Sequence, residues 1–162
     1  KEKVYRKSGN KYSVSPYGLS WDDENYYLVT FSHKYNGFTH YRVDRMSDIE
    51  LSEASREALP ENEHFNIAEY SKKVFNMFGG EEVTVKLKFD NTLVNAVIDR
   101  FGKDIMIGKL DDDSFSIWIK VVLSSTFYAW LAQFGNKVKI LSPEMVIEKY
   151  KDSIHDILDQ YE

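Results

Sequence analysis

A strict alternation of apolar and polar side chains runs through Val83-Thr84-Val85-Lys86-Leu87-Lys88-Phe89. Successive side chains of a strand point to opposite faces, so this stretch predicts one buried face and one exposed face with both lysines. Asp90 follows as a helix cap, and an apolar stripe at helical spacing extends to Phe101 before Gly102. The stretch therefore predicts a strand followed by a helix that packs on the apolar side of a sheet.

Further elements follow in a regular order. They are strands over 105–110 and 115–123 around Asp111-Asp112-Asp113-Ser114, a helix from Ser125 to Gly135, a strand over 138–141, and a long helix after Ser142-Pro143. The order β-α-β-β-α-β is typical of a ferredoxin-like domain. We therefore expect such a domain over residues 81–162, with one extra C-terminal helix.

The first part of the chain predicts β structure. Three runs predict strands, over residues 11–15, 26–31 and 38–46. Pro16-Tyr17-Gly18-Leu19 interrupts the first run, and Asn36-Gly37 predicts a tight hairpin turn because it tolerates positive φ at both central positions. Short strands with tight turns predict a small β-barrel over residues 1–52, since closure removes exposed sheet edges.

An acidic connection is predicted over residues 53–80. Around its start the sequence has only one lysine or arginine, Arg56, against six acidic residues. The acidic residues are Asp48, Glu50, Glu53, Glu57, Glu61 and Glu63. A short helix is expected after Asn66, which forms a capping-box-like pair with Glu69, and Gly79-Gly80 should end it. The predicted fold class is α+β, with the acidic segment as the hinge between two domains.

Composition excludes several classes of protein. The 162 residues are 43% hydrophobic and 29% charged, which is typical of a globular chain, and they include no cysteine. Disulfides and thiolate-bound metals are thus excluded, which fits a cytoplasmic protein. No apolar run approaches the ~20 residues of a membrane span. Residues 1–46 carry eight Lys and Arg against five Asp and Glu, whereas residues 47–162 carry 13 against 21, so a small basic site is expected only on the first third.

The sequence shows no motif typical of a catalytic, metal-binding or phosphate-binding site. The four histidines, His33, His40, His64 and His155, show no metal-binding spacing. Gly79-Gly80 ends a helix instead of opening one, so it predicts no phosphate loop, and Asp111-Asp112-Asp113 is more typical of a solvated turn than of a cation site. We therefore expect no catalytic residue, no metal, no cofactor and no enzymatic activity.

A candidate binding site lies in the third predicted strand. His40 and Arg42 share one face, while Tyr41 and Val43, which suit a core, share the other. Two neighbouring cations repel unless something anionic meets them. The alternative is that Asp44 and nearby glutamates pair with the arginines at the surface.

Two other sets of residues allow two interpretations. Lys86 and Lys88 could form a nucleic-acid-binding face with Arg100 or Lys120, but solvated strand exteriors carry the same residues, and that interpretation is favoured. Three aromatic residues at helical spacing are more typical of a core than of a base-stacking platform: Phe127, Trp130 and Phe134.

Several motifs, taken in order, resemble the WYL domain, a family named for a Trp-Tyr-Leu triplet. These motifs are residues 13–19, Trp21, Tyr26-Tyr27-Leu28-Val29 and residues 40–46. A second set of motifs resembles the C-terminal extension usually found behind the WYL domain, namely Trp130-Leu131, Phe134-Gly135 and residues 138–143. The resemblance covers nearly the whole chain. Tyr26 stands where the triplet has Trp, which keeps the aromatic packing but offers a smaller stacking surface.

The resemblance implies regulation. WYL domains are small Sm-like, SH3-type barrels, and most follow a helix-turn-helix DNA-binding domain in bacterial transcription factors, where they are taken as sensors of anionic effectors such as nucleotides or single-stranded nucleic acid. The family's basic and aromatic pocket residues match Tyr27, His40, Arg42 and Arg45 here, with Lys11 as a weaker candidate. Guanidinium groups suit phosphate oxygens, and a tyrosine ring can stack on a base.

The resemblance also implies parts beyond this chain. A helix-turn-helix that contacts DNA is expected upstream, and the barrel's first strand, which would lie before residues 1–6, is expected to be missing. A barrel open at one edge invites pairing, so a homodimer is expected. The expected function is ligand sensing in a transcription regulator. The alternatives are a purely structural dimerisation module and an Sm-like RNA-binding protein.

Overall fold

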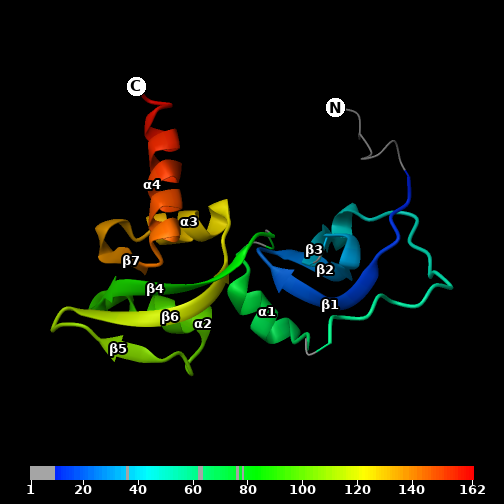
Figure 1. Ribbon diagram of the computed structural model, residues 1–162, viewed down its shortest axis with the longest axis horizontal. Coiled ribbons are helices and arrows are strands. Elements are labelled where there is room, and N and C mark those ends of the chain that lie inside the picture. The colour runs from blue at the N-terminus through cyan, green and yellow to red at the C-terminus, as the bar shows by residue number, and fades with distance from the viewer. Residues whose placement is uncertain (1–9, 36, 62–63, 76, 78) are drawn as a thin grey trace. The chain divides into compact units, whose positions relative to one another are not determined.

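The computed structural model describes residues 10–35, 37–61, 64–75, 77 and 79–162 (Figure 1). The chain divides into two compact units, Lys1–Phe65 and Asn66–Glu162. The fold class is α+β, as predicted, with one antiparallel sheet of three strands and one of four strands. The expectations about the barrel's first strand fall on residues 1–9 and upstream, outside the described residues.

The first unit contains three strands in the order β1-β2-β3, namely β1 (Ser15–Asp22), β2 (Asn25–Ser32) and β3 (Gly37–Arg42). The predicted interruption at residues 16–19 is wrong, because these residues lie inside β1. Pro16 is tolerated there since β1 is an edge strand of this sheet, and a β-bulge between Pro16 and Gly18 shifts the register.

A tight hairpin turn lies between β1 and β2, and the turn predicted at Asn36-Gly37 falls partly outside the described residues. Asp23 and Glu24 have positive φ angles of 45° and 60°, as a two-residue turn of the expected kind requires. Between β2 and β3 a short 3-10 helix, η2 (His33–Tyr35), makes the connection, and Asn36 lies outside the described residues. The third predicted strand ends at Arg42, before the 3-10 helix η3 (Val43–Arg45). Val43 is therefore exposed and not in the core.

Part of the predicted acidic connection packs on this sheet. The main-chain N–H of Glu57 donates to Ser15 Oγ at 3.0 Å, and its carboxylate accepts from the main-chain N–H of His33 at 2.7 Å. Its carbonyl oxygen accepts from the Tyr17 hydroxyl. The ring of Phe65 lies 4.8 Å from that of Phe38. The first unit therefore extends past residue 52, to Phe65.

The second unit is built on four antiparallel strands in the order β5-β6-β4-β7. The strands are β4 (Glu82–Asp90), β5 (Ile107–Lys109), β6 (Ser114–Val122) and β7 (Val138–Ser142). The α-helices are α1 (Ile67–Lys73), α2 (Val94–Phe101), α3 (Ser125–Ala132) and α4 (Glu144–Leu158), with 3-10 helices η4 (Asn91–Leu93) and η5 (Gly135–Lys137).

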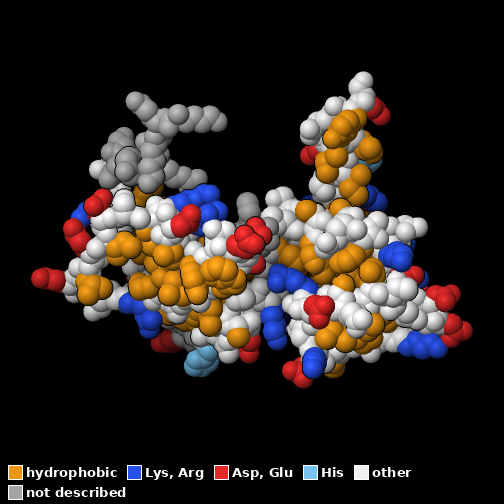
Figure 2. Space-filling model, turned by 180° about the vertical axis from the view of Figure 1, so that it is seen from behind, with side chains coloured by type: hydrophobic (Ala, Val, Ile, Leu, Met, Phe, Trp, Pro, Cys, Tyr) orange, Lys and Arg blue, Asp and Glu red, His pale blue; other side chains and the backbone are white. Residues whose placement is uncertain are grey.

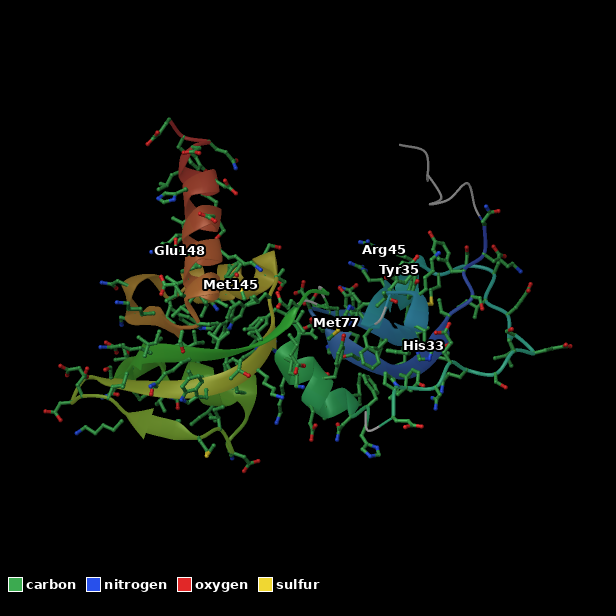
Figure 3. The ribbon with its side chains drawn as sticks, viewed as in Figure 1. His33, Tyr35, Arg45, Met77, Met145 and Glu148 are labelled. Atoms are coloured by element: carbon green, nitrogen blue, oxygen red, sulfur yellow. The ribbon has the colours of Figure 1, made fainter. Side chains whose placement is uncertain are left out.

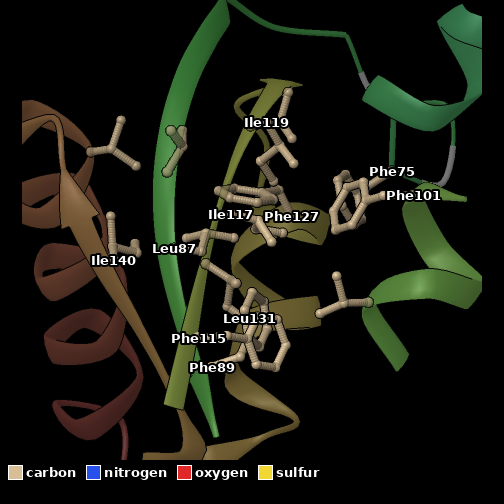
Figure 4. Packing of buried hydrophobic residues seen from close by; sticks show 14 residues of the cluster. Phe75, Leu87, Phe89, Phe101, Phe115, Ile117, Ile119, Phe127, Leu131 and Ile140 are labelled. Atoms are coloured by element: carbon tan, nitrogen blue, oxygen red, sulfur yellow. The ribbon is translucent and has the colours of Figure 1, made fainter. Parts of the chain in front are cut away.

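The core lies between one face of this sheet and the helices α2 and α3 (Figure 4). Val85, Leu87 and Phe89 are fully buried, which confirms the alternation predicted for β4. Phe127 and Leu131 of α3 meet them from the helix side. The aromatic stripe of α3 is thus a core stripe, as predicted.

The helix expected to reach Gly79 ends at Lys73. Asn66 caps α1 as predicted, since its side-chain oxygen accepts hydrogen bonds from the main-chain N–H groups of Ala68 and Glu69 at 2.9 and 3.3 Å. Beyond the helix the chain is extended at Val74, and Phe75 enters the core, with its ring 5.3 Å from that of Phe127. Core packing of these side chains overrides the helical spacing of the sequence.

Helix α4 is only partly buried by its own unit. Val146 lies in the core, and Ile147 and Tyr150 pack against it. Towards the C-terminus the apolar stripe is exposed, and Figure 2 shows apolar side chains along this part of the helix. In the part of the chain described, no helix is long and apolar enough to cross a bilayer.

Candidate anion-binding site

The register between β2 and β3 brings three candidate residues to one face. Tyr27 is paired with Arg42, and Val29 is paired with His40. Residues directly opposite each other in an antiparallel sheet point to the same side, so Tyr27, His40 and Arg42 lie on one face. The ring of Tyr27 and the guanidinium of Arg42 are therefore neighbours across the two strands.

This face also holds the core of the first unit. Phe31 and Phe38 lie on it, with ring centres 5.4 Å apart. Tyr41 points to the opposite face, where its ring lies 6.0 Å from that of Tyr12. The expectation that Tyr41 would face the core is therefore wrong. His40 and Arg42 lie at the rim of the core, beyond its aromatic cluster.

The guanidinium of Arg42 is held by Asp44. Arg42 Nε donates to Asp44 Oδ1 at 3.0 Å and Nη2 donates to Oδ2 at 2.8 Å, which is a two-point contact. This hydrogen bonding raises the pKa of Arg42 and lowers the pKa of Asp44. The geometry exists because the strand ends at Arg42 and the chain turns, which brings the carboxylate two residues later back to the guanidinium. This is the surface pair that the alternative interpretation expected.

Two further candidate residues, Arg45 and Lys11, have different surroundings. Arg45 is exposed on η3 (Figure 3), and its charge contributes to the lowered pKa of Asp44. Lys11 is exposed and forms an ion pair with Glu50 at 2.5 Å. The structure thus brings Arg42 and Arg45 together around Asp44, with Tyr27 opposite Arg42 and His40 two residues before Arg42 on the same face of β3.

Sequence reasoning missed two features of this unit. One is the two-point geometry between Arg42 and Asp44, for which the only signal was their spacing of two residues. The other is an exposed aromatic pair, Trp21 and Tyr26, whose ring centres are 4.6 Å apart. These side chains are 60% and 55% exposed, whereas the resemblance implied aromatic packing at Tyr26. In the described ranges, no group of three or more His, Asp or Glu residues is placed to hold a metal ion.

Comparison with known proteins gives matches to both units. A WYL domain model matches residues 3–51, and a WCX domain model matches residues 81–158. No curated protein matches the chain. Among solved structures, proteasome accessory factor B/C (PafBC) of Arthrobacter aurescens is similar, with 21% sequence identity and a TM-score of 0.44. The alignment covers 92% of this chain and 22% of that protein. The prediction from the motifs is confirmed: the chain belongs to the WYL-domain family and carries a WYL domain followed by a WCX domain.

Proposed function

We propose that this chain is the ligand-sensing part of a transcription regulator and that its WYL domain binds an anionic effector, either a nucleotide or single-stranded nucleic acid. The WYL and WCX domains support the assignment to a regulator. The observation that carries the site is the pairing of Tyr27 with Arg42, beside His40 and near Arg45. A guanidinium fork binds phosphate oxygens in pairs, and the neighbouring ring offers a surface for a base.

Asp44 would compete with an effector for the N–H donors of Arg42. Its carboxylate occupies Nε and Nη2 of Arg42, which are the donors that a phosphate would use. A phosphate that binds through these two donors must replace the carboxylate, whereas one that binds through Nη1 leaves the Arg42–Asp44 contact in place. Since Arg45 already acts on Asp44, it can hold the displaced carboxylate while Arg42 turns to the ligand.

The proposal includes the finer architecture of the two units. We assign the second unit to the ferredoxin-like arrangement, because β4 and β5 are joined through α2 and β6 lies between them in the sheet. For the first unit we propose an Sm-like barrel, of which β1, β2 and β3 supply three strands. In regulation, the effector would favour one arrangement of the two units and so bias a DNA-binding domain upstream.

A binding measurement on single variants tests the site. Fluorescence anisotropy of a labelled ten-nucleotide single strand, and calorimetry with ATP, are run at fixed low salt because such affinities depend on salt. Arg42→Ala should weaken binding and Asp44→Asn should strengthen it. Lys34→Ala, which removes a charge near the other end of β3, should change it little. Equal affinity of wild type and Arg42→Ala, with circular dichroism unchanged, contradicts the site.

The exposed stripe of α4 favours a second candidate, a dimerisation module. Ile154, Ile157 and Leu158 are 39%, 57% and 52% exposed on a helix whose first half packs on the core through Val146, Ile147 and Tyr150. A second copy that packs on this stripe would cover it. This candidate predicts a melting temperature that rises with protein concentration but not with nucleotide. Ile157→Asp should abolish the concentration dependence, and sedimentation should then show a monomer.

A further inference from the structure

The sheet of the second unit has a face that its core helices do not cover. The buried side chains of α2, α3 and α4 meet one side of β4 and β6, formed by residues such as Leu87 and Ile117. The alternating residues point the other way. We call this second side the open face. Its central residues are Thr84, Lys86 and Lys88 of β4, Ser116, Trp118 and Lys120 of β6, and Lys139 of β7, and the carboxylates Glu82 and Asp90 lie at its two ends.

The register arranges these side chains in rows across the strands. Lys139, Lys88 and Ser116 form one row, and Lys86 with Trp118 forms the next. The ammonium of Lys86 lies 5.4 Å from the centre of the Trp118 ring. At one end of the face, Trp118 and Lys120 share a shallow hollow of about 280 Å³ with lysines of α1.

Positive charge gathers on this face although its unit is acidic. Residues 66–162 carry 12 Lys and Arg against 15 Asp and Glu. Lys88 is paired with Asp111 at 3.2 Å, and Lys120 lies 3.9 Å from a carboxylate oxygen of Glu82. For Lys86 and Lys139, no carboxylate in the described ranges lies within ion-pair distance.

The pairing of Lys88 with Lys139 is unfavourable by itself. Like charges directly opposite each other on an antiparallel sheet repel, and here Asp111 offsets part of this repulsion through its ion pair with Lys88, while Lys139 has no such partner among the described residues. A polyanion that lies across β4 and β7 removes the remaining repulsion. The charge arrangement therefore favours an anionic partner.

Trp118 narrows the class of partner. Its large ring is 57% exposed in the middle of an otherwise polar face. An acidic peptide would use the lysines but has no base for the ring, and duplex DNA keeps its base faces stacked inside the helix. A single strand offers phosphates and free base faces together.

We propose that the open face binds single-stranded nucleic acid, with Trp118 stacked on a base and Lys86, Lys120 and Lys139 in contact with phosphates. Stacking of this kind tolerates any base, so the surface reads little sequence. Arg100, one of the partners considered from sequence, is not part of it. Its guanidinium lies over the ring of Phe75 at 4.0 Å and donates to the carbonyl of Val74. The proposal concerns the WCX domain and does not depend on an effector site in the WYL domain.

Binding of a labelled ten-nucleotide thymidine strand to the full chain tests the stacking. Trp118→Leu should weaken the affinity by about 5- to 150-fold, and Trp118→Phe should retain part of it. In wild type the strand should quench tryptophan fluorescence, and in Trp118→Leu that quenching should disappear although Trp21 and Trp130 remain.

The salt dependence tests the role of the lysines at the phosphates. The double variant Lys120→Gln/Lys139→Gln should reduce the slope of log affinity against log salt by roughly 1.4, about 0.7 for each phosphate that is no longer neutralised. The matched double variant Lys103→Gln/Lys151→Gln removes the same charge from elsewhere in the unit and should leave the slope unchanged.

Three outcomes would overturn the proposal. They are unchanged affinity in a folded Trp118→Leu, equal affinity for an abasic strand of the same length, and equally strong competition by polyglutamate. The Trp118→Leu loss should be of the same size in an Arg42→Ala background. If Arg42→Ala has no effect but Trp118→Leu weakens binding, the WYL effector site fails and the open face stands.

Discussion

Two adjacent glycines should respond in opposite ways to the same substitution. A methyl group added at Gly80 would overlap the carbonyl oxygen of Leu123 and lie 3.2 Å from its carbonyl carbon and from Val122 Cγ1. At Gly79 an added methyl group meets nothing within 4 Å. The sequence treated both glycines as one helix terminator, whereas the structure gives only Gly80 a packing role.

The magnitude follows from the main chain that would have to move. The Leu123 N–H donates to the carbonyl of Glu81 at 2.9 Å, next to the site of overlap, so separating the two segments strains this bond. Overpacking costs about 1–3 kcal/mol and a weakened hydrogen bond about 1 kcal/mol, so Gly80→Ala should lose about 2–4 kcal/mol of unfolding free energy. Gly79→Ala should gain about 0.4–1 kcal/mol, because alanine restricts the unfolded chain.

Urea unfolding followed by circular dichroism measures both variants against wild type. The slope of free energy against urea should stay constant, so that midpoints report stability. A Gly80→Ala variant as stable as wild type, or equal losses in the two variants, would refute the close approach of residue 80 to the end of β6.

Three further predictions concern a helix cap, a core ring and an ion pair. Asn66→Ala should destabilise the second unit by about 0.5–2 kcal/mol in urea unfolding, while Asn66→Asp, which can still cap α1, should not. Phe75→Ala should cost about 3–5 kcal/mol in the same assay, because the ring is buried in the core, and a small loss would mean that this segment is not part of it. The pKa of Asp44 is lowered, so its pair with Arg42 stabilises the fold above pH 3.8, its ordinary value, and this contribution is lost as pH falls through the lower folded value. The difference in melting temperature between wild type and Asp44→Asn should therefore shrink between pH 6 and pH 3, and a constant difference would contradict the pair.

The sequence predicted those elements whose pattern is local. In β4 each residue shows its face by its own polarity, and the Asn66 cap depends only on main-chain groups two and three residues away. The WYL and WCX domains were recognisable for a similar reason, since their motifs occur in a fixed order along the chain.

Elements decided by distant contacts were not predicted. The chain at Val74 leaves the helix because the ring of Phe75 packs against α3, some 50 residues away in sequence. Lys139 could be placed opposite Lys88 only from the register of β7 on β4.

In the proposed site, the Arg42–Asp44 pair would make binding selective among anions. The carboxylate is tethered two residues from the guanidinium, so its effective concentration there is high and independent of dilution. Chloride and other single-point anions cannot replace both of its hydrogen bonds at once, whereas a phosphate can. We therefore expect single-point anions to leave the Arg42–Asp44 contact intact, and an anion with two correctly spaced oxygens to replace Asp44 at these two donors.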